Sequence, residues 1–145
     1  MNKLNFELVP DGCWYSNLRS LLSKKQWDFL RADAKARADG RCTICGRKTD
    51  KLEAHERWSY DEKNAVQKLE DIVAVCKDCH SVIHIGRTQL VGNEERAEKH
   101  YMKVNNCSYS DYRKALGEAN ERHKRLNLVA EWKLDLTYLK RFTKD

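Results

Sequence analysis

Two pairs of cysteines, each with the spacing CxxC, constrain this chain more than any other feature. Cys42 pairs with Cys45 and Cys76 with Cys79, and residues 46–75 lie between the pairs. Each CxxC forms a tight turn that aims both sulfur atoms at one point, so two pairs can complete a tetrahedral zinc site. The sequence therefore predicts a structural Zn²⁺ bound by Cys42, Cys45, Cys76 and Cys79.

Disulfide bonds and redox chemistry are the alternative roles for these cysteines. Disulfides are typical of small secreted chains, but residues 1–7 lack the basic stretch and apolar stretch of a signal peptide. A thioredoxin-like redox site needs one CxxC pair rather than two matched ones. Cys13 and Cys107 stand alone, and we expect both to be ordinary reduced thiols.

Composition and charge limit the class of protein and its partners. With 145 residues, 41% hydrophobic and 34% charged, the chain fits one soluble domain with a modest core. No apolar run approaches membrane-spanning length, so we expect no membrane partner and a cytoplasmic location. The net charge of +6 favours an anionic partner, most commonly nucleic acid. Charge alone leaves a merely well-solvated basic surface equally open.

The first secondary-structure signals lie before and between the cysteine pairs. Ser23 and Gln26 have capping-box spacing, which predicts a helix from there to about Asp39. A short run at 52–56, flanked by polar loops, predicts a strand. The β-branched run at 72–75 predicts a second strand that leads directly into the second CxxC pair.

A helix is predicted over residues 79–85, immediately after the second strand. His80 and His84 would lie at positions i and i+4 of this helix, about 6 Å apart on one face. That separation is close enough for both to bind one metal ion. The predicted order around the zinc is strand, loop, strand, helix.

The C-terminal third is predicted to be helical. Apolar residues recur at helical spacing over 93–105, and a second helix begins near Ser108 or Ser110 and ends around Leu126. The segment 132–139 is too apolar for a loose end, so we expect it to pack back onto the protein.

The cysteine and histidine pattern resembles the HNH (ββα-metal) nucleases. The resemblance lies in the CxxC pair, an Ala-His dipeptide at His55, and a CxxCH with a further histidine at His84. It is specific over residues 41–86, and a looser likeness to small bacterial and phage proteins extends along nearly the whole chain. It implies an α+β fold in which a ββα-metal zinc module is embedded in a mainly helical small domain. The expected single domain, 1–145, divides into an N-terminal helical segment 1–40, the module 41–86 and a C-terminal helical extension 87–145.

The resemblance also implies a second metal. In that family the four cysteines hold the structural zinc, and a separate divalent cation neutralises the scissile phosphate. His55, His80 and His84 match the ligands of this second ion, which can be Mg²⁺, Mn²⁺, Ni²⁺ or Zn²⁺. The implied chemistry is metal-dependent hydrolysis of phosphodiester bonds. A satisfied buried histidine is the alternative role for His55.

Two positions depart from the family pattern. Glu56 stands where the general-base histidine is expected, and Asp71 where an asparagine orients the water. Glu56 can be a base if burial raises its pKa, or a fourth ligand that closes a second structural zinc site. Neighbouring strand residues face opposite sides, so His55 and Glu56 bind one metal together only across a bulge. A register shifted by one makes His55 the base but leaves Ala54 as a ligand, which alanine cannot be.

Two hypotheses for function follow. The first is an HNH-like DNA endonuclease with Glu56, His55 and Asp71 as catalytic residues. The second is a catalytically inactive HNH-like zinc module that binds nucleic acid or a protein partner, which would suit a phage or host-defence context in a bacterial or phage-infected cell. In either case three basic side chains near the site are expected to hold phosphates, with a solvated basic face as the alternative: Arg57, Lys77 and Arg87.

Overall fold

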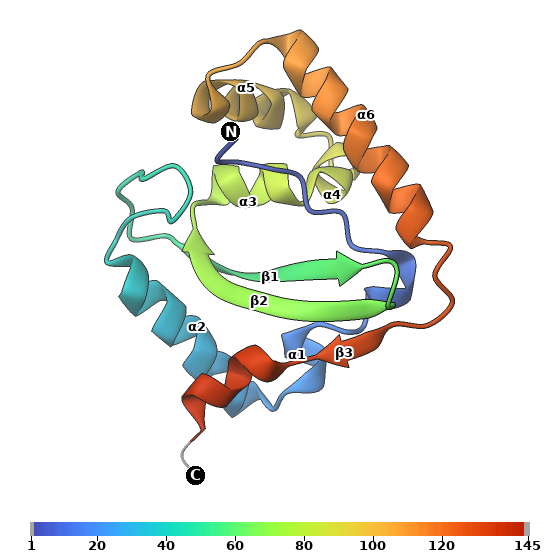
Figure 1. Cartoon of the computed structure of the whole chain (residues 1–145). Helices are drawn as coiled ribbons and strands as arrows, with labels where there is room; N and C mark the ends of the chain where they lie inside the picture. Colours follow the sequence, from blue (N-terminus) through green and yellow to red (C-terminus); the bar gives the residue numbers. More distant parts are fainter. Residues whose placement is uncertain (1, 144–145) are drawn as a thin grey trace.

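A computed structural model describes residues 2–143, and it combines a three-stranded sheet with helices on both of its faces (Figure 1). This confirms the predicted α+β class. In chain order the elements are η1 (Asp11–Cys13), α1 (Leu18–Leu21), α2 (Lys24–Ala38), β1 (Glu53–Asp61), β2 (Val66–Val75), α3 (Lys77–Ile83), α4 (Ile85–Leu90), α5 (Glu94–Asn105), α6 (Tyr109–Leu126), β3 (Lys133–Asp135) and η2 (Thr137–Phe142).

The sheet is built on a long hairpin. β1 pairs antiparallel with β2, and β3 adds to β2 in parallel, so β1 lies at an edge of the sheet. Both hairpin strands are longer than the predicted strands at 52–56 and 72–75. The prediction at 72–75 covers only the fully buried end of β2, because buried Gln67 and Leu69 alternate with more exposed residues over the rest of that strand.

The predicted helix starts are confirmed by their side-chain caps. Ser23 accepts a hydrogen bond from the Gln26 amide and closes a capping box at the start of α2. Ser108, rather than Ser110, does the same with Asp111 at the start of α6. The helix predicted over 93–105 is α5.

The helix predicted over 79–85 is wrong at both ends. It begins earlier, at Lys77, because the Cys76 sulfur accepts a hydrogen bond from the Cys79 amide and caps α3. It ends at Ile83, and His84 lies between α3 and α4 with φ −98° and ψ 52°. The His84 amide still donates to the carbonyl of His80, so the two histidines stay one turn apart.

Two buried clusters of side chains pack on the sheet. One joins the sheet to α3, α5 and α6, and the other joins it to α1, α2 and η2. Figure 1 shows the same arrangement, with α3 and α4 on one side of the hairpin and β3 and η2 on the other. The C-terminal tail packs back as predicted, since Tyr138 of η2 is buried in the second cluster.

The first residues of the N-terminal segment form an irregular stretch ahead of the helices of 1–40. No helix precedes η1 in the residues described, and the chain from Leu4 to Pro10 runs between the hairpin and α6 (Figure 1). Leu4 is fully buried, and the Glu7 amide donates to the Ile83 carbonyl at the end of α3. This segment therefore brings Glu7 beside the histidines. Within residues 2–143, no helix is both long enough and apolar enough to cross a membrane.

Candidate metal centres and the cleft

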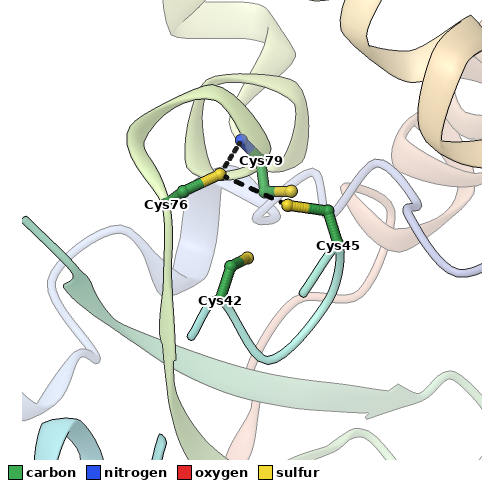
Figure 2. A group of neighbouring side chains, drawn as sticks. All are labelled: Cys42, Cys45, Cys76 and Cys79. Carbon is green, nitrogen blue, oxygen red and sulfur yellow. Dashed lines mark hydrogen bonds between the residues drawn. The ribbon is translucent and has the colours of Figure 1, made fainter. Parts of the chain in front are cut away.

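The four CxxC cysteines come together as predicted (Figure 2). Cys42 and Cys45 lie in the loop between α2 and β1, Cys76 directly follows β2, and Cys79 lies in the first turn of α3. Their sulfur atoms all lie within 4.8 Å of one another. The Gly46 amide donates to the Cys42 carbonyl at 2.9 Å and closes the first turn. We call these four residues the cysteine cluster; they form a possible site for a structural zinc ion.

Proton sharing in the cysteine cluster fits a cation-binding site. Hydrogen bonding from Cys79 lowers the pKa of the Cys42 thiol to about 4, and the same bond raises the pKa of Cys79. Burial, followed by repulsion from Cys42, raises the pKa of Cys76 to about 11. One thiolate therefore forms readily, while burial and repulsion oppose ionisation of its neighbours. A divalent cation at the centre removes that opposition, as four-thiolate zinc sites require.

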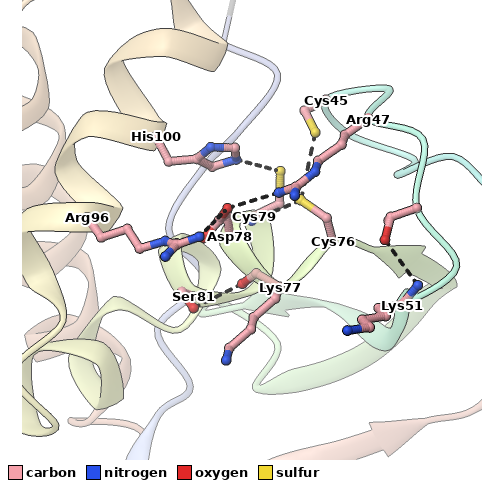
Figure 3. Close-up of polar contacts among 11 residues, drawn as sticks. Cys45, Arg47, Lys51, Cys76, Lys77, Asp78, Cys79, Ser81, Arg96 and His100 are labelled. Carbon is pink, nitrogen blue, oxygen red and sulfur yellow. Dashed lines mark hydrogen bonds and ion pairs between the residues drawn. The ribbon is translucent and has the colours of Figure 1, made fainter.

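Polar groups outside the cysteine cluster support it (Figure 3). His100 of α5 places Nε2 3.2 Å from the Cys79 sulfur. Asp78 accepts from Arg96 at 2.8 Å and from Arg47 at 3.1 Å, which ties α5 and the first cysteine turn to α3. The Arg96 hydrogen bond lowers the pKa of the Asp78 carboxyl. No sequence pattern singles out His100, although it borders the apolar stripe predicted for its helix.

Substitution of His100 by alanine is expected to weaken zinc binding by roughly 10- to 100-fold, since an N–H donor to a metal-bound sulfur is lost. Competition with a chromophoric chelator measures the change. Lys99→Ala, at an exposed position of the same helix, is the control. Equal zinc affinity in the two variants would show that His100 does not support the cysteine cluster.

The second group of ligand atoms comes from three histidines. His55 of β1, His80 of α3 and His84 place their ring nitrogens within 4.8 Å of one another. Their ring centroids are 4.8 to 5.4 Å apart, and the rings meet at steep angles rather than stacking. We call them the histidine cluster. Three converging imidazoles are a donor set that suits a divalent transition metal.

Two carboxylates hold the histidine cluster from outside. His80 donates from Nδ1 to Glu53 at 2.7 Å, and Nε2 of His55 lies 3.1 Å from Glu7. One nitrogen of each ring is thereby oriented and the other is left to bind a metal, as in carboxylate–histidine–metal arrangements. Strand alternation could have predicted Glu53, two residues before His55. No local signal predicts Glu7, because its position depends on the path of the N-terminal segment.

Burial keeps His80 and His84 in the neutral form that binds metals. It lowers the pKa of His84 to about 3, with further lowering from the nearby His80 and His55 rings. Burial also lowers the pKa of His80, although the Glu53 hydrogen bond opposes the change. Both rings are therefore neutral at pH 7, and their free nitrogens are available as ligands.

The histidine cluster lines a cleft of about 960 Å³, which we call the histidine cleft. The other walls come mainly from the N-terminal segment between Glu7 and Arg19, from β1 and from α4, with single residues of α2, β2 and α6: Trp27, Gln67 and His123. Because β1 is an edge strand, residues from both of its faces reach the cleft. His55 itself is only 3% exposed and lies deep. A metal ion with three ligands here would keep an open position toward the cleft.

Glu56 and Asp71 are both held by other parts of the fold. Glu56 lines the cleft but faces the side of β1 opposite His55; it accepts hydrogen bonds from the Leu18 amide at 2.9 Å and the Trp58 indole at 3.2 Å. Burial raises its pKa. Asp71 accepts from the hydroxyl of Tyr138 at 2.8 Å, in the second cluster of buried side chains.

The three predicted phosphate-binding residues do not lie together. Arg87 of α4 lines the histidine cleft. Lys77 is exposed at the start of α3, and Arg57 pairs across the hairpin with Asp71; neither lines that cleft. Arg19, which the sequence did not single out, lines it as well.

Comparison of the chain with protein-family models, curated proteins and solved structures found no match in any of the three. The assignment of function therefore depends on the geometry of the two clusters and the cleft.

Proposed function

We propose that the protein is a metal-dependent DNA endonuclease that hydrolyses phosphodiester bonds in the histidine cleft, with a structural zinc in the cysteine cluster. The observation that carries this proposal is that three histidines converge in a cleft beside four converging cysteines. The hairpin followed by α3 also supports a ββα-metal arrangement for residues 53–83.

Different residues of the cleft would bind the metal, orient its ligands and bind phosphates. His55, His80 and His84 would hold the cation, which supplies a Lewis acid for the phosphate and lowers the pKa of a water molecule. Glu7 and Glu53 orient two of the three rings. Arg87 and Arg19 supply positive charge along the cleft for the neighbouring phosphates.

Glu56 is the side chain that we expect to accept the proton from water. Its carboxylate lines the same cleft, and burial raises its pKa toward the range in which a carboxylate is an effective base at neutral pH. The hydrogen bonds from Leu18 and Trp58 fix its orientation. Glu56 faces the side of β1 opposite His55, which argues against it as a fourth ligand of a closed site.

One observation favours a second function, a non-catalytic zinc module. Glu56 and Asp71 occupy the positions that the HNH resemblance assigns to catalysis, and both make structural hydrogen bonds. A scaffold that has lost its catalytic pair while retaining its metal ligands would show the same pattern. Its partner would then be nucleic acid or another protein.

Nicking of supercoiled plasmid, with each divalent metal and with a chelator, separates the two functions. We expect the wild type to nick with metal and Glu56→Gln to lose about 100-fold or more in rate, as for removal of a general base. Glu70→Gln, an exposed carboxylate of β2 that bonds Ser59, is the control. Undiminished nicking by Glu56→Gln would exclude Glu56 as the general base but would keep the nuclease. No nicking with any metal, from zinc-loaded protein, would exclude the nuclease and leave the binding module.

A further inference from the structure

We infer that the histidine cleft binds single-stranded rather than duplex DNA, with Trp14 stacking on a base. The inference deepens the proposed function by naming its substrate class, and it rests on that function for the phosphate at the histidine cluster. It is carried by the depth of the cluster, the aromatic walls of the cleft and the charge along it.

The histidine cluster is too deep for the surface of a rigid helix. His55 is 3% exposed, while His80 and His84 are half-buried, so a phosphate must enter the cleft to approach all three rings. Duplex DNA is stiff over about 50 nm and keeps its bases stacked inside, so its backbone does not bend into a cleft without distortion. A single strand turns at each phosphate and can follow the cleft inward.

Apolar side chains stand where an unstacked base would lie. Trp14 lines the cleft with 61% of its surface exposed, and Leu90 of α4 lines it with 89% exposed. Trp58 and Tyr60 add half-buried aromatic surface along β1. Base–aromatic stacking accepts any sequence, and it is the usual way in which proteins hold single strands.

The charge of the cleft matches a nucleic-acid backbone. Arg19 and Arg87 line it, and among residues 2–143 neither forms an ion pair. The two acidic residues on the walls are already engaged, Glu7 by His55 and Glu56 by two N–H donors. Arg19 and Arg87 are therefore the charged side chains of the walls that are free to contact phosphates, in a chain with net charge +6.

Fluorescence anisotropy with a labelled oligo-thymidine, and with a duplex of the same length, tests this inference without added divalent metal. We expect the single strand to bind at least tenfold tighter than the duplex. Trp14→Ala should weaken single-strand binding at least about fivefold, the lower end for loss of a stacking aromatic, and Trp14→Phe should restore most of it. Tyr15→Ala is the matched control, because Tyr15 is 85% exposed and does not line the cleft.

Three results would overturn the inference: equal or tighter binding of duplex, equal effects of Trp14→Ala and Tyr15→Ala, or binding of neither oligonucleotide. The proposed function fails separately. Plasmid nicking without preference for single strands would remove this inference and keep the nuclease. Single-strand binding that depends on Trp14, from protein that nicks nothing, would support the inference and remove the nuclease.

Discussion

Cys76→Ser is expected to unfold the part of the protein around the cysteine cluster. Zinc bound by four thiolates contributes on the order of 10–16 kcal/mol in small modules, against roughly 5–15 kcal/mol for the stability of a whole domain. Cys76 also joins two elements, because it follows β2 and its sulfur caps α3. Loss of zinc would therefore release both the strand end and the helix that carries His80. Cys42→Ser is expected to act in the same way.

Circular dichroism melts, together with zinc content, measure this effect. Cys107→Ser is the control, since Cys107 is only partly buried and lies outside the cysteine cluster. We expect the control to keep its zinc and its melting temperature within a few degrees of the wild type. A Cys76→Ser protein that melted like the control would contradict a stabilising role for zinc.

His84→Ala is expected to abolish plasmid nicking while the protein stays folded. The substitution removes one of three metal ligands. Loss of a group that only orients a ligand already lowers metal affinity or activity about 10- to 100-fold. We therefore expect a loss greater than 100-fold. His84 lies between α3 and α4 and makes no side-chain hydrogen bond in the part of the chain described. Stability should consequently change by only about 1–2 kcal/mol.

His123→Ala is the matched control for that experiment. His123 also lines the histidine cleft, but its ring donates to the Val9 carbonyl at 3.1 Å and takes no part in the histidine cluster. Initial nicking rates and thermal melts are compared for the two variants. Equal rates would show that His84 has no special role in cleavage.

The metal-ligand groups were predictable because their geometry is local. The tight turn of each CxxC fixes the direction of its two sulfurs, and His80 and His84 are one helical turn apart. His55 joins them because β1 and β2 form a hairpin that brings the strand against α3. The three histidines do come together. The helix that was expected to contain both His80 and His84, however, stops at Ile83.

The groups around the clusters were less predictable because they are distant in sequence. Glu7 reaches His55 across 48 residues, and only the path of the N-terminal segment places it there. His100 reaches Cys79 because α5 packs on α3. The parallel pairing of Lys133 with Val66 likewise follows from tertiary packing of the tail. Periodicity identifies which face of an element is buried, but not which distant segment covers it.

The histidine cleft also could not be predicted from the sequence. Its walls combine Trp14, Arg19 and Arg87 with the edge strand β1, and no spacing rule relates these residues. A tryptophan at a cleft wall and a tryptophan in a core have the same sequence signal. Trp14 is 61% exposed, whereas Trp27 of α2, which also borders the cleft, is buried.

Native mass spectrometry of the intact chain, equilibrated with a divalent metal and then freed of excess, tests the central claim most directly. That claim is that the histidine cluster holds a second metal ion beside the zinc of the cysteine cluster. The account predicts two ions per chain in the wild type. A single ion per chain, in protein that retains its zinc, would contradict it.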